Sequence, residues 1–282
     1  MTEEDDHLAL EAIEVDLFIE AMLRRYGYDF RDYGRTSLTR RVRNLAQQFG
    51  TGTISALTAL VLHSPERIGE VIGGLSVPAS DFFRDPAIFR ALKAHVFPVL
   101  ASYARITIWQ AGCARGEEVY SLAILLKEAG LYEKSRIFAT DISETSLASA
   151  QEGIFPLSDM RDASRRYFES GGTQSLSAHY HARYERAKLD RGLIDNVTFA
   201  EHNLVTDGVF CEAHLILCRN VMIYFNDRLQ ARVLNLFADT LVRGGFLCVG
   251  DRENLRVAGA SLFRPVEGAP SVFRLRSPVE PP

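Results

Sequence analysis

Lysine is scarce in this chain of 282 residues. Lysine and arginine together number 32, and the only lysines are Lys93, Lys127, Lys134 and Lys188. The basic charge is therefore almost entirely arginine. Because aspartate and glutamate number 36, the formal net charge is −4 at pH 7. That balance argues against a general nucleic-acid binder.

Long apolar runs are also missing. No stretch approaches the roughly 18 consecutive apolar residues that a membrane-spanning helix needs, and the mean hydropathy is only −0.03. Residues 1–6 are acidic and polar, so no secretory signal peptide is visible. The sequence therefore predicts a cytoplasmic protein that does not insert into a membrane.

Cysteine is rare, and no pair has the C-x-x-C spacing of a metal or redox site. The four cysteines are Cys113, Cys211, Cys218 and Cys248. We expect free thiols, as in proteins of a reducing compartment. His179 and His181 alternate along one stretch, but two histidines without a third ligand do not make a metal site, so we expect none.

The most informative stretch covers residues 106–120. A β-branched run at 106–108 leads into a turn that contains Gly112 and Gly116, and an apolar helical pattern then continues to Gly130. A strand, a glycine loop and a helix in this order build nucleotide pockets, because the glycines let the backbone approach the ligand. The spacing is not G-x-G-x-x-G, which disfavours a dinucleotide dehydrogenase.

Polar residues follow several other predicted strands. Asp141 ends the strand predicted at 136–140, where such folds hold ribose hydroxyls, and this favours an adenosine-containing ligand. Asn203 follows the strand predicted at 197–200, and Arg219-Asn220 follows the one at 215–218. Because ligands of open α/β sheets bind beyond the carboxyl ends of the strands, we expect a shared site there.

The charge reverses near the N-terminus. Residues 1–20 carry eight acidic groups and no lysine or arginine, and the pattern predicts a loose acidic tail followed by an amphipathic helix. Seven arginines then follow between positions 24 and 43. This reversal favours a surface that docks an acidic partner, although a simply solvated helix face is the usual meaning of such a charge run.

Thr36 or Ser37 can cap a helix that runs to Phe49 and ends at Gly50. Its apolar residues predict a buried stripe, with the arginines on the other faces. The stripe is Leu38, Val42 and Leu45, and the arginines are Arg40, Arg41 and Arg43.

These patterns predict the domain organisation. Residues 1–75 form a helical domain, residues 76–86, which include Pro78, form a linker, and residues 87–277 form an α/β domain. A helix is expected at 86–100. Around residues 157–195 the α/β rhythm breaks, and a small antiparallel β insertion is expected there.

Five motifs resemble those of a known family, in the same order along the chain. They are Phe82-Phe83-Arg84-Asp85, Ala111-Gly112-Cys113-x-x-Gly116-Glu117-Glu118-x-Tyr120-Ser121, Ala139-Thr140-Asp141-Ile142, Asn203-Leu204 and Cys218-Arg219-Asn220-Val221-Met222-Ile223-Tyr224-Phe225. The family is CheR, the S-adenosylmethionine-dependent methyltransferases of chemotaxis receptors. Two departures from its usual pattern are Ala114-Arg115, where the family has Ser-Thr, and Pro78, where it has Asn.

The resemblance implies an α/β fold: a seven-stranded Rossmann-like class I methyltransferase domain with an antiparallel last strand and a small antiparallel β-subdomain insertion. A small all-helical N-terminal domain precedes it. The resemblance also implies S-adenosylmethionine as cofactor, with S-adenosylhomocysteine as product. The implied cofactor contacts are Ser80, Arg84, Glu118, Asp141, Asn203, Leu204, Arg219 and Asn220. Arg84 and Tyr224 are implied to lie near the reacting groups.

The implied substrate is a glutamate in the helical cytoplasmic region of a methyl-accepting chemoreceptor, and we expect a monomeric enzyme. A glutamate is already ionised at neutral pH, so its methylation needs no general base. Asp141 would accept hydrogen bonds from the ribose, Glu118 would pair with the methionine ammonium, and Arg40, Arg41 and Arg43 would dock the acidic receptor.

Two alternatives stay open at this point. One is a cofactor-binding protein that docks on a receptor but is catalytically weak or inactive, suggested by the departures at Ala114, Arg115 and Pro78. The other is a methyltransferase that acts on a small molecule or on a different protein.

Overall fold

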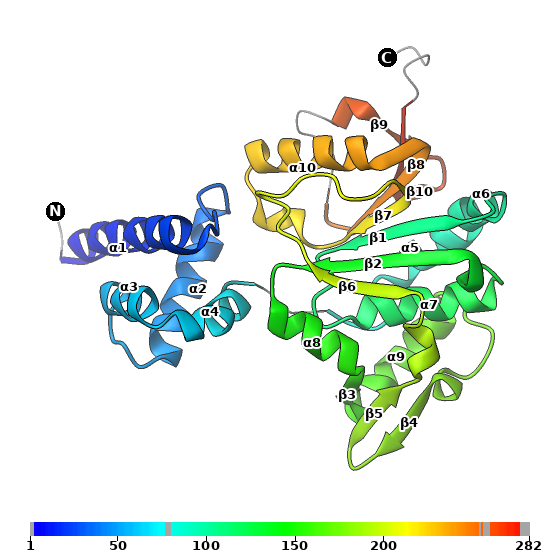
Figure 1. Cartoon of the computed structure of the whole chain (residues 1–282), viewed down its shortest axis with the longest axis horizontal. Coiled ribbons are helices and arrows are strands. Elements are labelled where there is room, and N and C mark those ends of the chain that lie inside the picture. The colour runs from blue at the N-terminus through cyan, green and yellow to red at the C-terminus, as the bar shows by residue number, and fades with distance from the viewer. Residues whose placement is uncertain (1–2, 77–79, 254, 256–259, 277–282) are drawn as a thin grey trace. The chain divides into compact units, whose positions relative to one another are not determined.

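The chain forms two compact units, each described here by itself (Figure 1). The computed structural model describes residues 3–76, 80–253, 255 and 260–276. A helical unit comprises Met1–Val77 together with Tyr224–Leu229, and a larger unit comprises Pro78–Ile223 and Gln230–Pro282. Pro78, in the predicted linker, lies outside the described residues.

In the described residues of its N-terminal part, the helical unit contains four α-helices. They are α1 (Glu3–Tyr26), α2 (Arg35–Gln48), α3 (Ile54–His63) and α4 (Ile68–Leu75). Helix α2 follows Gly34 and is succeeded by Gly50, whose φ of +65° ends the helical path. Its predicted stripe of Leu38, Val42 and Leu45 is buried, as expected. Helix α3 is capped by Thr53, whose hydroxyl accepts a hydrogen bond from the Ala56 amide at 3.1 Å.

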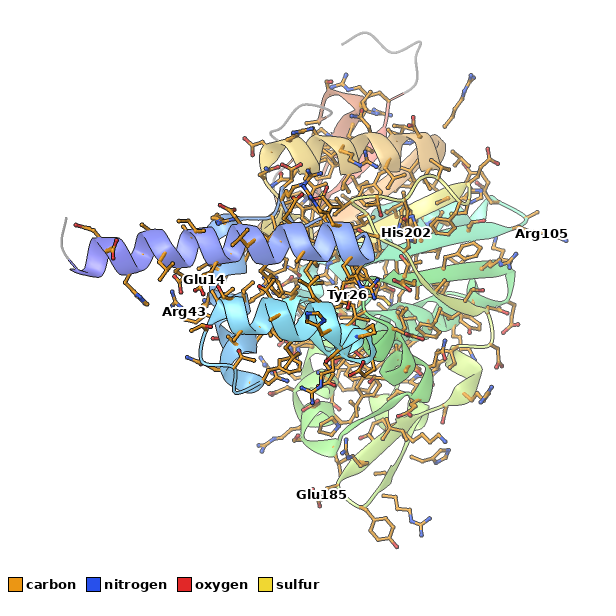
Figure 2. All side chains as sticks on the ribbon, turned by 60° about the vertical axis from the view of Figure 1, so that its left-hand side comes forward. Glu14, Tyr26, Arg43, Arg105, Glu185 and His202 are labelled. Atoms are coloured by element: carbon orange, nitrogen blue, oxygen red, sulfur yellow. The ribbon has the colours of Figure 1, made fainter. Side chains whose placement is uncertain are left out.

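Helix α1 begins earlier than the sequence pattern indicates, because the acidic stretch from Glu3 onward is helical rather than a loose tail. The helix buries Val15, Phe18, Ile19 and Met22. The residues Leu10, Ile13 and Leu17 are instead each more than half exposed. Near its C-terminus the Tyr26 hydroxyl donates to the Val61 carbonyl of α3 at 2.6 Å (Figure 2).

The larger unit is built on a seven-stranded sheet in the order β6-β2-β1-β7-β8-β10-β9. The strands are β1 (Ile106–Ala111), β2 (Ser135–Asp141), β6 (Val197–Glu201), β7 (Ala213–Cys218), β8 (Leu241–Val249), β9 (Phe263–Val266) and β10 (Ala269–Leu275). The five strands from β6 to β8 in this order are parallel to one another, whereas β10 is antiparallel to both β8 and β9. The seven-stranded fold with an antiparallel last strand is therefore confirmed.

The helices around the sheet follow the predicted alternation, with one interruption. They are α5 (Pro86–Ala91), α6 (Phe97–Ala101), α7 (Glu117–Glu128), α8 (Glu144–Glu152), α9 (Leu157–Glu169) and α10 (Asp227–Thr240). The single helix predicted over 86–100 is broken by a π turn at Leu92–Val96, next to Pro98, which lacks an amide donor. None of the helices within the described ranges has both the length and the apolar character of a membrane span.

Side chains of β1 alternate between the two faces of the sheet. The Trp109 ring lies 5.4 Å from the Phe237 ring of α10, and its Nε1 donates to Thr140 Oγ1 at 2.9 Å. Ile108 packs instead into the large apolar cluster that contains Leu122 of α7. Helices thus cover both faces of the sheet (Figure 1). Polar side chains that could bind a ligand are therefore expected at the ends of the strands, where the sheet is not covered by helices.

A second, three-stranded antiparallel sheet forms the predicted insertion, in the order β3-β5-β4. Its strands are β3 (Ile154–Pro156), β4 (Tyr180–Arg183) and β5 (Arg186–Leu189). The sheet begins with β3, before α9, whereas the sequence places its strands only after a helix. Strands β4 and β5 form a hairpin whose turn residues Tyr184 and Glu185 have positive φ, and Glu185 marks its far end in Figure 2.

Candidate functional site

The glycine loop joins β1 to α7 and requires residues without a side chain. Gly112 has φ +74°, and a Cβ there would lie 2.5 Å from a methyl carbon of Val221. The amides of Gly112 and Cys113 donate to the Thr140 carbonyl at 2.8 and 2.9 Å, so the loop is tied to the end of β2. Gly116, with φ +90°, precedes the first turn of α7. Glycine at both positions therefore lets the loop backbone pack closely against Val221 and Ala150.

Asp141 ends β2 and fastens the same loop. One carboxylate oxygen accepts a hydrogen bond from the Ala114 amide at 2.8 Å, and the other accepts from the Ser143 amide at 3.0 Å. Burial raises the pKa of Asp141 above its ordinary value, while these amide donors act in the opposite direction. The carboxylate therefore has a structural task besides the ribose contact predicted from sequence.

Arg219 is the centre of a buried ionic cluster. Its side chain is only 1% exposed, and one guanidinium nitrogen, Nη1, donates to the Glu118 carboxylate. The other, Nη2, lies 2.9 Å from Asp85 Oδ2 and donates to the Arg84 carbonyl at 2.7 Å. Burial raises the pKa of Glu118, and the neighbouring guanidinium of Arg219 opposes that shift. The predicted cofactor residues Glu118 and Arg219 thus contact each other directly.

The segment after Arg219 is held by a residue that the sequence analysis did not single out, Glu253. Its Oε2 accepts from the amides of Asn220 and Gly250, both at 2.7 Å, and its Oε1 accepts from the Ile223 amide at 3.2 Å. Asn220 has φ +60°, a conformation that these bonds stabilise. Glu253 follows the carboxyl end of β8, so the same strand-end argument that selected Asp141 would have found it.

The residues before α5 lie against the start of α7. Burial raises the pKa of Glu117, and the nearby Ser80 side chain acts in the opposite direction. Phe82 and Phe83 are both buried, and the Phe83 amide donates to the Ser121 hydroxyl at 2.9 Å. Arg84 is partly exposed, with its Nε 3.9 Å from the Asp85 carboxylate.

Asn203 and Leu204 follow β6 and are both buried. The side-chain oxygen of Asn203 accepts from the Val205 amide at 3.0 Å, and its backbone amide donates to Asp207 at 2.8 Å. These bonds form a local turn. The His202 amide donates to the Asp141 carbonyl at 3.1 Å, which joins this turn to the end of β2.

The larger unit therefore gathers most of the predicted cofactor residues at the carboxyl ends of four neighbouring parallel strands. Gly112, Asp141, Asn203 and Arg219 follow β1, β2, β6 and β7, which are adjacent in the order β6-β2-β1-β7. Of the departures from the family pattern, Arg115 places Nη2 2.9 Å from Glu117 Oε1. Ala114 takes a positive φ of 48°.

The thiols near this edge are not suited to nucleophilic chemistry. Cys113, Cys218 and Cys248 are buried, and none of the three forms a disulfide bond. Burial raises the pKa of each thiol, to about 12 for Cys248. A thiol with so high a pKa is not ionised at neutral pH. The site therefore favours a reaction whose nucleophile the substrate brings with it.

The remaining predicted residues, Tyr224 and the arginines of α2, belong to the helical unit. Arg40 is exposed on α2. Arg43 is exposed as well but forms two hydrogen bonds to Glu11 of α1, at 2.8 and 2.7 Å, and Figure 2 shows Arg43 on this unit near Glu14. Arg41 is only 7% exposed and points toward Tyr224, contrary to the outward orientation that the sequence pattern predicted.

A groove of about 640 Å³ lies between α1 and α2. Its lining mixes arginines, hydroxyls and short apolar groups, and consists of Leu8, Glu11, Ala12, Arg35, Thr36, Ser37, Thr39, Arg40 and Arg43. Arg35, which lines the groove, also lies 2.6 Å from Asp16 of α1. Acidic groups of α1 thus already contact two of the α2 arginines.

Two family models together match almost the whole chain. The CheR methyltransferase, SAM binding domain, matches residues 79–271, and the CheR methyltransferase, all-alpha domain, matches residues 13–75. The boundary between the two matches falls at residues 76–78, within the predicted linker.

Curated relatives agree with these models. The chain is 44% identical over 263 residues to a putative methyltransferase, Cher3, of Pseudomonas putida, covering 93% of this chain and 96% of that protein. It is 27% identical to a chemotaxis protein methyltransferase of Listeria monocytogenes, covering 84% of this chain and 88% of that protein. It is also 30% identical to an uncharacterised 104.1 kDa protein of Rhodobacter capsulatus, covering 80% of this chain but only 24% of that protein.

Proposed function

The chain belongs to the CheR methyltransferase family and is an S-adenosylmethionine-dependent methyltransferase, and from this premise we propose its substrate. We propose that it methylates glutamate side chains in the helical cytoplasmic region of a chemoreceptor, and thereby adjusts the adaptation of a signalling pathway. We further propose that it works in the cytoplasm. The observation that carries the proposal is that one chain combines a polar sheet edge, where the thiols of Cys113, Cys218 and Cys248 have raised pKa values, with a helical unit that displays exposed arginines.

The residues at the sheet edge fit the cofactor. Asp141, at the end of β2, offers carboxylate oxygens for ribose hydroxyls. Arg219 Nε is buried without a hydrogen-bond partner among the described residues, a donor that a ligand carboxylate would satisfy. Ser80, Arg84, Glu118, Asn203, Leu204 and Asn220 complete the proposed contacts. When bound, S-adenosylmethionine supplies an electrophilic methyl group on its sulfonium.

The protein's task in this reaction is placement. A glutamate carboxylate is already ionised at neutral pH, so no residue has to remove a proton. The residues near the reacting groups, which we propose to be Arg84 and Tyr224, need to orient the carboxylate and exclude water. Arg84 would steer the carboxylate rather than hold it in a tight bidentate pair, because such a pair would lower its nucleophilicity.

Docking of the receptor is assigned to the exposed arginines of α2. Arg40 is exposed, and Arg43 stands at the groove beside α1. An acidic helical surface would compete with Glu11 for Arg43, so the affinity should be modest and sensitive to salt. Arg41, which is buried, is left out of this docking surface.

Replacing Asp141 with alanine should weaken binding of S-adenosylhomocysteine by about 10- to 100-fold, the range expected when hydrogen bonds to a charged acceptor are lost. Calorimetric titration of the purified protein measures this directly. Asp141→Asn keeps one oxygen that can accept from the Ala114 amide, so the loop should stay in place. A loss of affinity in this variant would then come from the lost ribose contact and not from disorder of the loop. Glu144→Ala, an exposed carboxylate three residues later, is the matched control. Wild-type affinity in Asp141→Ala would refute the assignment.

Binding of S-adenosylhomocysteine should also weaken as the pH is lowered. The ribose hydroxyls donate to ionised Asp141, and a proton on that carboxyl removes an acceptor. Because burial raises the pKa of Asp141 above 3.8, the loss should begin at a higher pH than for an exposed aspartate. Titrations between about pH 8 and pH 5 test this. In Asp141→Asn the side chain cannot take up this proton, so the affinity should depend less on pH than in the wild type. An identical pH dependence in both proteins would contradict the role.

Turnover decides between the proposal and its main alternative. Methyl transfer from labelled S-adenosylmethionine to purified cytoplasmic fragments of methyl-accepting chemotaxis proteins, as base-labile ester, supports the proposal. Cofactor binding without turnover on any fragment would favour a receptor-docking protein that is catalytically inactive. The departures at Ala114, Arg115 and Pro78 motivate this alternative, and Arg115 forms an ion pair with Glu117 at the start of α7.

A further inference from the structure

Tyr224 is fixed to the helical unit through its backbone and that of its neighbours. The Tyr224 carbonyl accepts a hydrogen bond from the Gly34 amide at 2.7 Å. Phe225 forms an isolated β-bridge with Tyr33, and their rings lie 5.1 Å apart. The Asn226 amide donates to the Asp32 carbonyl at 2.9 Å. Residues Tyr224–Leu229, which include the first residues of α10, therefore belong to the same unit as α2.

The ring of Tyr224 is held by Arg41. The guanidinium carbon of Arg41 lies 4.3 Å from the centre of the Tyr224 ring, within the range of a cation–π contact. The guanidinium is itself fixed, because Nη1 donates to the Leu75 carbonyl at 2.7 Å and Nη2 donates to the Ser37 hydroxyl at 3.0 Å. A planar group anchored at two oxygens presents one defined face to the ring.

Arg41 and Arg40 are adjacent in sequence but differ in environment. Arg40 is exposed, whereas Arg41 is 7% exposed and burial lowers its pKa. Successive helix positions point about 100° apart, so one arginine can face solvent while the next faces the segment at Tyr224. A desolvated cation–π contact is stronger than an exposed one, which favours a fixed Tyr224 ring.

We propose that Arg41 is a positioning residue, which holds the Tyr224 ring and so the direction of its hydroxyl during methyl transfer, and that it is not a docking arginine. This inference rests on the proposed function, in which Tyr224 lies near the reacting groups. Its consequence is a division of labour on α2: the exposed Arg40 contacts the receptor, and the buried Arg41 sets the geometry of a side chain that acts on the bound glutamate.

The test is a comparison of Arg41→Met with Arg40→Met in the full-length protein. Both remove one charge from the same helix and keep an unbranched side chain. Arg41→Met should lower kcat about tenfold or more, because small misplacements are costly in such reactions, and should change KM for the receptor fragment less than twofold. Arg40→Met should act mainly on KM, raising it about two- to fivefold as for a surface ion pair. The fragment used is the one that the wild type methylates fastest.

A double-mutant cycle adds a readout that a general structural defect would not give. If Arg41 acts through the Tyr224 hydroxyl, Arg41→Met should have no further effect on kcat once Tyr224→Phe has removed that hydroxyl. Arg41→Lys keeps the charge over the ring but lacks the two-pronged anchor, so its kcat should lie between wild type and Arg41→Met. If Arg41→Met does not fold, Arg41→Lys replaces it in the same comparison of kcat and KM.

The outcomes separate the inference from its premise. If the wild type methylates no fragment, the proposed function fails. If the wild type is active and Arg41→Met raises KM with kcat unchanged, as Arg40→Met does, Arg41 is a docking residue and the inference is wrong. Fully additive effects of Arg41→Met and Tyr224→Phe on kcat would overturn it as well.

Discussion

Replacing Arg219 with methionine should lower the free energy of unfolding by about 3–5 kcal/mol, as when one partner of a buried ion pair is removed. The side chain of Arg219 is 1% exposed, and its guanidinium is the counter-charge for Glu118 and Asp85. Without it, Glu118 would remain buried, and its pKa, already raised by burial, would rise further. We also expect binding of S-adenosylhomocysteine to become undetectable, because Glu118 and Arg219 are both proposed cofactor contacts. Urea denaturation and calorimetric titration measure the two effects.

Two further variants make the result specific. Arg165→Met removes an exposed arginine that lies near Asp162 and Glu169 on α9, and such surface pairs contribute less than about 1 kcal/mol. Adding Glu118→Gln to Arg219→Met removes the uncompensated charge and should restore part of the lost stability. If Arg219→Met is as harmless as Arg165→Met, the buried cluster does not stabilise the fold as described.

Replacing Glu253 with glutamine should lower kcat of methyl transfer about 100-fold and the free energy of unfolding by about 1–3 kcal/mol. Glu253 accepts from three backbone amides with two oxygens, whereas glutamine has one oxygen and an amide that donates. At least one backbone N–H would then face another donor. The segment from Asn220 to Ile223, which leads to Tyr224, should shift as a result.

Asp251→Asn is the matched control for Glu253→Gln, because Asp251 lies two residues earlier in the same turn and is exposed. It should change neither stability nor turnover measurably. Equal behaviour of the two variants would mean that Glu253 does not position the Asn220–Ile223 segment. A loss of stability without a loss of kcat would limit Glu253 to a structural role.

The location of the candidate site could be predicted because it depends on local signals. Gly112, Asp141 and Arg219 each follow a strand that its composition marks clearly, and parallel strands place their carboxyl ends along one edge. The seven-stranded fold with its antiparallel last strand came from the family resemblance, because local sequence patterns do not show which distant strands pair. The short strand β9, which contains Pro265 and lies at the sheet edge, has too weak a pattern to be recognised.

The pairing of the charged groups could not be predicted in the same way. The helical period places Arg40, Arg41 and Arg43 outside the apolar stripe of α2, but it does not show which other segment covers them. Arg41 is covered by a segment that follows it by more than 180 positions, and Arg43 is bound by Glu11 of α1. Long side chains can be buried by distant residues even where local composition indicates a solvated face.

The helical unit is discontinuous in sequence, and this has a consequence for synthesis on the ribosome. Its first part ends at Val77 and its last part is Tyr224–Leu229, so it cannot be complete until most of the larger unit has been made. At about 5–20 residues per second, the roughly 150 intervening residues take about 8–30 s to translate. During that time the cation–π contact between Arg41 and Tyr224 cannot form. The Gly34 amide likewise lacks the Tyr224 carbonyl as its hydrogen-bond acceptor. Of the two units, the helical one begins to be made before the larger one but is completed only after Tyr224–Leu229 have been translated.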